Sequence, residues 1–181
     1  AEVTRLLGST LLLTLTGTGG TGKTRLALQV VADLLERHPQ GVWLVELAPL
    51  ADPALVPLAV ATALGLREEA GQPVLATLVA ALRPRRLLLV LDNCEHLLEA
   101  CATLAEALLR ACPRIVVLTT SREAVGVAGE VTWRVPSLAL PDPRHLLSPE
   151  ELLQVEAVHL FVERARAALP HFTLTVQHVS A

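Results

Sequence analysis

Apolar residues recur along the chain with two spacings, and each spacing predicts a different kind of element. Short, mostly apolar runs rich in Leu and Val are typical of buried parallel strands. Such runs cover 10–16, 42–47, 87–91, 115–118 and 131–135. In the longer segments between them, apolar residues stand three and four positions apart, as one face of a helix requires. Helices are therefore expected over 23–37, 52–64, 73–82 and 94–112, with a further helix from 148 to about 169.

The order of these elements predicts the fold class. Strands that alternate with helices indicate right-handed βαβ units and a parallel sheet. The run 87–91 is continuously apolar, so we expect it inside the sheet rather than at an edge. Asp52 followed by Pro53 fits a helix cap with proline in the first turn. The chain is thus predicted to be α/β, with helices flanking a parallel sheet.

The loop after the first predicted strand carries the clearest chemical signal. Residues 17–24 read GTGGTGKT, which matches the phosphate-loop (P-loop) pattern G-x-x-x-x-G-K-[ST]. Glycines let the backbone curl so that its N–H groups point inward at phosphate oxygens, and the following helix aims its positive end at the same place. The residues expected to contact nucleotide are Gly17, Thr18, Gly19, Gly20, Thr21, Gly22, Lys23, Thr24 and Arg25.

Two side chains of this loop have distinct expected roles. Lys23 is the only lysine among 15 basic residues, and it should reach the β- and γ-phosphates of a nucleoside triphosphate. We expect its side chain to face solvent when no nucleotide is bound. The Thr24 hydroxyl should be a ligand of Mg²⁺.

Polar residues end two other predicted strands. Asp92 follows the run LLLVL, at the carboxyl end of its strand, where parallel sheets place their sites. We expect it to hold Mg²⁺ with Thr24, although an aspartate here could instead cap the next helix. Arg122 follows the run IVVLTTS and is expected to sense the γ-phosphate, with an ordinary surface arginine as the alternative. Lys23, Asp92 and Arg122 are therefore the predicted catalytic residues.

The general base is less clearly marked. A second acid directly after the magnesium aspartate would polarise the attacking water, but the chain has Asn93 there. Glu95 is a candidate base, and the alternative is a solvated acid that complements a helix dipole. A site without a well-placed base should hydrolyse slowly, which suits a switch better than a motor.

Composition excludes several other classes. The net charge is −3, which lacks the positive field of a nucleic-acid binder, so we expect no direct nucleic-acid contact from this chain. Cys94, Cys101 and Cys112 match neither a zinc site nor a disulfide framework and are expected to be buried thiols in a reducing cytoplasm. The sequence carries no signal-peptide pattern and no apolar run long enough to span a bilayer.

Four segments resemble one known group of ATPases. They are LTLTGTGGTGKTRLALQVV, GVWLVELAPLADPALV, RRLLLVLDNCEHLLEAC and VVLTTSREAVGVAGEVTWRVPSLALP. Together they resemble the NB-ARC-type domain of large LuxR-type and AfsR-like bacterial transcriptional regulators, members of the STAND class of P-loop NTPases. The resemblance extends from about Leu11 to Phe172. Its V-G-R-E segment, which helps to hold adenine, is absent from AEVTRLLGS, and its G-L-P-L segment and winged helix do not follow.

The resemblance implies a three-layer fold with a five-stranded parallel sheet in the order 5-1-4-3-2. It implies ADP bound at rest, ATP with Mg²⁺ bound when active, and self-association of the full-length protein. We accordingly expect a P-loop nucleotide-binding domain in residues 1–140. Residues 141–181 are then expected to be a linker and the first helix of a truncated helical subdomain, within a larger protein.

Two other functions remain open from the sequence. A small-molecule P-loop kinase needs a mobile arginine-rich lid, and the one arginine cluster, Arg83, Arg85 and Arg86, precedes the Asp92 strand instead. A non-catalytic module could hold ADP structurally. The function favoured by the sequence is an ATP- and ADP-binding regulatory switch with slow ATPase activity.

Overall fold

The computed structural model describes residues 2–67, 71–142 and 148–174. The chain forms two compact units, Ala1–Val135 and Pro136–Ala181, and each is described separately. The first unit contains the sheet and the P-loop. The second contains helices α6 and α7.

All five predicted strands form, and they make one parallel sheet. The strands are β1 (Leu12–Thr16), β2 (Val42–Glu46), β3 (Leu88–Asp92), β4 (Val116–Ser121) and β5 (Val131–Arg134). Their order is β2-β3-β4-β1-β5, and every neighbouring pair is parallel. Read from the other edge, this is the order 5-1-4-3-2, so the predicted fold is confirmed. β3 lies inside the sheet and is buried along its whole length, as its apolar run predicts.

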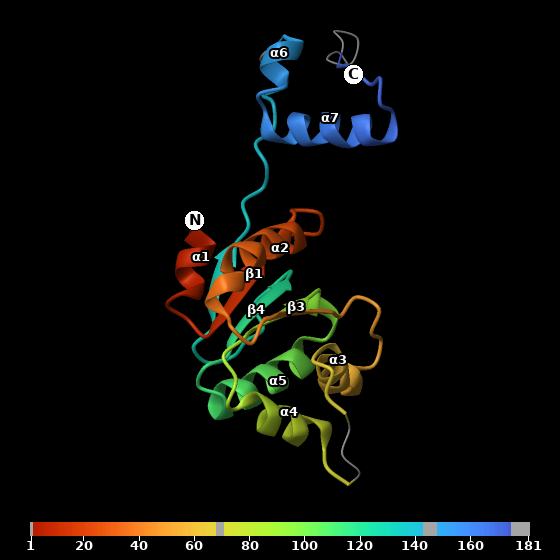
Figure 1. Cartoon of the computed structure of the whole chain (residues 1–181). Helices are drawn as coiled ribbons and strands as arrows, with labels where there is room; N and C mark the ends of the chain where they lie inside the picture. Colours follow the sequence, from red (N-terminus) through yellow and green to blue (C-terminus); the bar gives the residue numbers. More distant parts are fainter. Residues whose placement is uncertain (1, 68–70, 143–147, 175–181) are drawn as a thin grey trace. The chain divides into compact units, whose positions relative to one another are not determined.

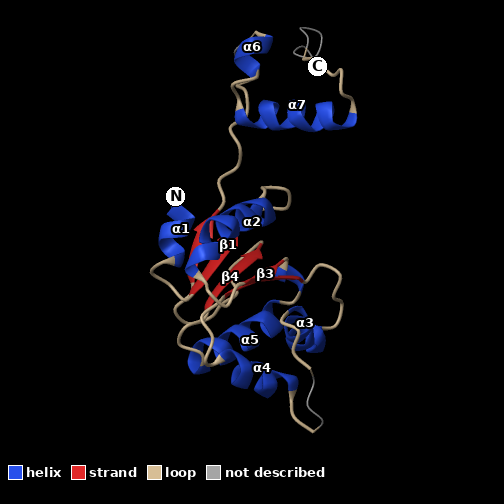
Figure 2. Cartoon of the chain, viewed as in Figure 1, coloured by secondary structure: helices blue, strands red, loops and turns tan. Residues whose placement is uncertain are grey.

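Helices cover both faces of this sheet, which gives three layers (Figures 1 and 2). One face carries α1 (Glu2–Leu7) and α2 (Lys23–Leu34). The other carries α3 (Val56–Ala63), α4 (Val74–Leu82) and α5 (Leu98–Ala111). Three short 3₁₀ turns complete the unit: η1 (Leu35–Arg37), η2 (Pro53–Leu55) and η3 (Cys94–His96).

Alternate residues of β3 face the two helical layers. Leu89 and Leu91 pack in the core shared with α3, α4 and α5, whereas Leu88 and Val90 pack in the core shared with α1 and α2. All four side chains are fully buried. Successive side chains of a strand point to opposite faces, so a strand between two helical layers has to be apolar at every position. This double burial fixes β3 and therefore the position of Asp92 at its end.

Several helix boundaries differ from those expected. α1 is not predicted by the sequence analysis, although Val3 and Leu7 bury one face of it. The expected helix 94–112 begins as η3, and α5 starts only after Leu97, whose backbone is not helical. The expected helix 52–64 begins as η2. There Asp52 does cap the turn, because its side chain accepts a hydrogen bond from the backbone N–H of Ala54.

The described part of the second unit, residues 136–142 and 148–174, contains two helices instead of the single expected one. α6 (Pro149–Leu152) begins with a capping box between Ser148 and Glu151. The backbone is extended at Val155, and α7 (Glu156–Ala168) starts there. Among the residues that the structure describes, no helix of either unit has the length and apolarity needed to cross a membrane.

Candidate functional site

The site lies where the parallel strands end. β1 runs directly into the P-loop, β3 ends in Asp92, and β4 ends in Thr120 and Ser121. Thr16 is in register with Ser121. Because carboxyl ends of parallel strands meet at one edge, segments about 70 and 100 residues apart are brought together there.

Glycine conformation shapes the P-loop. Gly20 and Gly22 have φ angles of 81° and 85°, a left-handed region in which a side chain is strained. Gly22 is the cap residue of α2, so the chain leaves the loop and enters the helix without a side-chain cap. The first N–H groups of a helix have no partner within it, and they remain available for an anion. Arg25 is exposed on the first turn of this helix.

Lys23 lies differently from the expectation. Its side chain is only 8% exposed rather than facing solvent. The ammonium group donates to the carbonyl oxygens of Gly17 (2.9 Å) and Thr18 (3.0 Å). A charge this buried has to be hydrogen-bonded, and the curled loop supplies the acceptors. Lys23 therefore also holds the loop in shape.

Asp92 is the centre of a hydrogen-bond network. The Thr24 hydroxyl donates to its two carboxylate oxygens at 2.8 and 3.0 Å, and the Thr120 hydroxyl donates to Oδ1 at 2.5 Å. Thr120 Oγ1 in turn accepts the backbone N–H of Asn93 at 3.0 Å. Thr120 was not singled out by sequence analysis, since its hydroxyl meets Asp92 only through the pairing of β3 with β4.

This pair of oxygen ligands fits a magnesium site. Mg²⁺ takes oxygen ligands and is commonly bound through one or two protein groups, with phosphates and waters completing its shell. Thr24 and Asp92 are the two groups that would hold it here. Within the described ranges, no cluster of three His, Cys, Asp or Glu side chains could hold a metal unaided.

The turn after Asp92 carries Glu95. Asn93 has a φ of 64°, the one left-handed residue other than glycine in the described chain, and asparagine tolerates this conformation well. The Glu95 carboxylate is paired through Oε1 with Arg122 Nε at 3.3 Å. Sequence analysis named both residues, but their pairing depends on how the β3 and β4 ends meet.

Glu130 is a structural anchor that sequence analysis missed. Its Oε1 accepts the Thr14 hydroxyl (2.5 Å) and the backbone N–H of Val125 (2.8 Å), and its Oε2 accepts the N–H of Gly126 (2.8 Å). Glu130 thus ties the loop between β4 and β5, which begins with Arg122, to the middle of β1. The signal in the sequence was an acid placed just before a strand, which by itself looks like a solvated loop residue.

A hollow of about 540 Å³ opens beside the P-loop. We call it the P-loop hollow, and its lining residues are Thr16, Gly17, Thr18, Gly19, Arg122, Glu123, Ala124, Thr132 and Arg134. The lining carries two arginines, Arg122 and Arg134, and one acid, Glu123, so its net positive charge favours an anionic ligand. Arg134, on the edge strand β5, is a further cationic group that sequence analysis did not assign.

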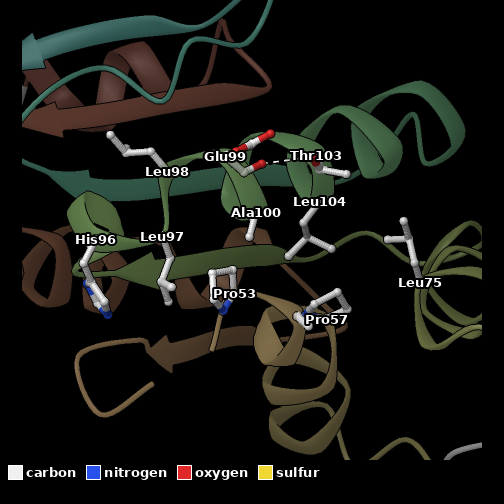
Figure 3. Close-up of a pocket in the computed structure, with 11 residues that line it drawn as sticks. Pro53, Pro57, Leu75, His96, Leu97, Leu98, Glu99, Ala100, Thr103 and Leu104 are labelled. Atoms are coloured by element: carbon white, nitrogen blue, oxygen red, sulfur yellow. Dashed lines mark hydrogen bonds between the residues drawn. The ribbon is translucent and has the colours of Figure 1, made fainter. Parts of the chain in front are cut away.

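A second hollow, of about 470 Å³, lies between α5 and the segment η2–α3 (Figure 3). Pro53 and Pro57 face Leu97, Ala100 and Leu104 across it, and Leu75 of α4 closes one end. No P-loop residue lines it, and its side chains with polar groups are His96, Glu99 and Thr103. Unlike the P-loop hollow, its lining contains no arginine.

The three cysteines are free and buried, as expected. Cys94 lies just beyond Asp92, and a hydrogen bond with Cys101, together with burial, raises the pKa of the Cys94 thiol. The same hydrogen bond lowers the pKa of the Cys101 thiol. A thiol with a raised pKa stays protonated and is a poor nucleophile, so Cys94, the cysteine next to Asp92, is not marked as a reactive group.

Comparison with protein families shows to which family the chain with this P-loop belongs. Residues 7–127 match the family described as AAA domain. The chain belongs to the AAA domain family. This AAA domain is 44% identical over 173 residues to an uncharacterized protein of Mycobacterium tuberculosis, covering 96% of the chain and 41% of that protein. It is also 44% identical over 176 residues to an M. tuberculosis protein that carries the name of an HTH-type transcriptional regulator, covering 97% of the chain and 18% of that protein. The chain thus spans well under half the length of either relative.

Solved structures share the fold of this AAA domain. The Aeropyrum pernix ORC2 protein, solved as ADPNP–ADP complexes, has a TM-score of 0.60 at 18% identity, over 98% of this chain and 63% of that one. Cdc6p from Pyrobaculum aerophilum has a TM-score of 0.61 at 19% identity, over 92% of this chain and 48% of that one. A STAND protein with a tetratricopeptide repeat sensor from Pyrococcus horikoshii has a TM-score of 0.53 at 14% identity, over 99% of this chain and 26% of that one. At these identities the likeness establishes the fold alone.

Replacing Glu130 by glutamine should destabilise the first unit by about 1–3 kcal/mol, because an amide nitrogen would then face a backbone N–H that now has a carboxylate acceptor. Chemical denaturation followed by circular dichroism measures the change. Glu123→Gln, in the exposed part of the same loop, is the control and should change stability by less than about 0.5 kcal/mol. Equal stability of Glu130→Gln and the parent protein would contradict the anchoring role.

Proposed function

We propose that the chain is the nucleotide-dependent switch domain of a regulatory protein, which binds ATP or ADP with Mg²⁺ and hydrolyses ATP slowly. One observation carries the proposal. The Thr24 hydroxyl and the Asp92 carboxylate meet at 2.8 Å, at the mouth of the P-loop that Lys23 shapes. This arrangement suits a metal-bound triphosphate better than any other ligand class.

Each group has a proposed role. The N–H groups of the P-loop and of the first turn of α2 cradle the phosphates, and Lys23 neutralises them. Thr24 and Asp92 hold Mg²⁺, which would offset negative charge on the phosphates. Arg122, at the rim of the P-loop hollow, contacts the γ-phosphate and so distinguishes ATP from ADP.

Slow hydrolysis follows from the residues around Asp92. The residue directly after Asp92 is Asn93, which cannot act as a base, and Glu95, the nearest acid along the chain, is paired with Arg122 in the protein without nucleotide. Proton transfer by a positioned base typically contributes about 10²–10⁴-fold to a rate, so a site with no acid directly after the magnesium aspartate should turn over slowly. Glu95 remains the candidate base. Phosphate-release assays beside ATP and ADP titrations, with and without Mg²⁺, test this proposal and separate it from a module that holds ADP without turnover.

The kinase alternative is not supported by a suitable acceptor site. A kinase needs an acceptor pocket beside the one that holds the nucleotide phosphates. The P-loop hollow is the space proposed here for those phosphates, and the hollow in Figure 3 is lined by none of the P-loop residues. Arg83, Arg85 and Arg86 precede β3 and so lie toward the amino ends of the strands, away from the P-loop. A lid at this position would not reach the phosphates.

The role of the whole protein is part of the same proposal. The unit with α6 and α7 would be the start of a helical subdomain, and residues up to about 140 would form the P-loop domain. The similarity to a protein named as an HTH-type transcriptional regulator supports control of transcription by other parts of a larger protein. Nucleotide exchange would then govern self-association.

Replacing Lys23 by alanine should weaken ATP binding by about 1.5–3 kcal/mol, since a charged donor to phosphate is lost. The melting temperature without nucleotide should also fall, because Lys23 donates to two loop carbonyls. Isothermal titration and thermal melts measure the two effects. Gln29→Ala, exposed on the same helix, should change neither. An unaltered ATP affinity in Lys23→Ala would remove the P-loop assignment.

Replacing Asp92 by asparagine should abolish most of the gain in ATP affinity that Mg²⁺ gives, since the metal loses its charged ligand. ADP binding measured in EDTA should stay close to that of the parent protein, and this measurement is the internal control. Titrating ATP with and without Mg²⁺ gives the result. Normal magnesium dependence would mean that Asp92 only organises Thr24 and Thr120.

Replacing Arg122 by alanine should weaken the binding of ATP more than the binding of ADP, because only ATP carries the γ-phosphate. The expected loss of binding free energy for ATP is about 1.5–3 kcal/mol. Both affinities are measured on one variant, so general destabilisation cancels in their ratio. Turnover should fall as well, since the arginine would stabilise the transferring phosphoryl group. Equal losses for the two nucleotides would show that Arg122 senses nothing.

A further inference from the structure

The pairing of Arg122 with Glu95 gives the proposed sensor a second partner. Arg122 Nε lies 3.3 Å from Glu95 Oε1, within salt-bridge distance. The same guanidinium reaches the P-loop, since its Nη2 nitrogen lies 4.0 Å from the position that a Cβ atom on Gly19 would occupy. Arg122 therefore lies within reach of both the glutamate and the phosphate-binding loop.

The Glu95 carboxylate is only partly satisfied. Its Oε2 is buried and has no hydrogen-bond partner, although the side chain as a whole is 18% exposed. Glu130, near the other end of the loop that begins with Arg122, uses both oxygens and accepts three hydrogen bonds. A carboxylate that anchors structure is satisfied in this way, whereas one with an orphan oxygen is held at a cost. Glu95 is thus less well satisfied than Glu130, and Arg122 is the one cationic side chain paired with it among the described residues.

Arg122 is correspondingly free to move. Its side chain is 68% exposed, so water screens the arginine side of the pair, although Glu95 itself is only 18% exposed. A charge-assisted contact with a phosphate is stronger. A γ-phosphate can therefore take the arginine from the glutamate, whereas ADP lacks the group that competes for it.

We propose that Glu95 is a latch on the sensor: its carboxylate holds Arg122 until a γ-phosphate displaces the carboxylate from the arginine. The need to break this pair lowers the affinity for ATP, and the release of Glu95 depends on ATP. This inference rests on the proposed switch function and adds regulation at the same site. Glu95 acts here through Arg122 and is a positioning residue. Its carboxylate is released only when the γ-phosphate is present.

The test is a double-mutant cycle on nucleotide affinity. Glu95→Gln removes the competing charge and keeps the shape, so ATP should bind at least about 1.5- to 5-fold more tightly, the factor for an ion pair exposed on both sides, since Glu95 is more buried than that. ADP affinity should be unchanged. In the Arg122→Ala background, Glu95→Gln should leave ATP affinity as it is, because there is no sensor left to hold. Affinities are measured by isothermal titration with Mg²⁺, and Glu95→Ala repeats the cycle should the glutamine variant fold poorly.

The outcomes separate the latch from the function on which it rests. Weaker or unchanged ATP binding in Glu95→Gln, or the same gain with and without Arg122, overturns the latch while leaving a nucleotide-binding switch intact. Failure of the parent protein to bind ATP or ADP overturns the proposed function itself. A purely structural Glu95 would lower the melting temperature and shift both affinities together, so the ratio of ATP to ADP affinity would stay constant.

Discussion

The site depends on how the Asp92 carboxylate is held. Asp92 is 4% exposed, and a carboxylate this buried is costly unless hydrogen bonds satisfy it. Thr24 from α2 and Thr120 from β4 supply them. The three residues come from elements that are distant in sequence, and their side chains meet at the carboxyl edge of the sheet. Their hydroxyl and carboxylate oxygens are arranged without a ligand, so under the proposed function nucleotide binding would not have to order them.

Local patterns predict the fold and the core of the site well. The strand runs, the glycine-rich loop and an acid at the end of a buried strand are each encoded by neighbouring residues, so the parallel sheet and the position of Asp92 follow from sequence. The strand order came from family resemblance rather than from the pattern. Helix ends were less accurate: Leu97 and Val155 interrupt helices whose apolar spacing continues through them. Burial of α1 against the sheet depends on partners that a local window does not contain.

What the sequence could not predict is which polar groups meet. Lys23 looks solvent-facing in a flexible loop, but the loop curls around it and its carbonyls bury the ammonium group. Thr14 and Glu130 are 116 residues apart in sequence and share a hydrogen bond because β1 and β5 are neighbours. Such contacts are set by strand pairing. Residues of ordinary appearance in sequence can therefore be essential to the loop geometry.

The loop from Arg122 to Glu130 combines a fixed end with a movable one. Glu130 binds its end of the loop through three hydrogen bonds, so the backbone there does not have to rearrange. Arg122 is exposed and is paired with one oxygen of the Glu95 carboxylate. A ligand shifts an equilibrium only by its differential affinity for two states, and a strongly held arginine would leave a γ-phosphate too little advantage to move it. Under the proposed function, an exposed arginine on a rigid frame is the arrangement that would let one phosphate group decide the state of the site.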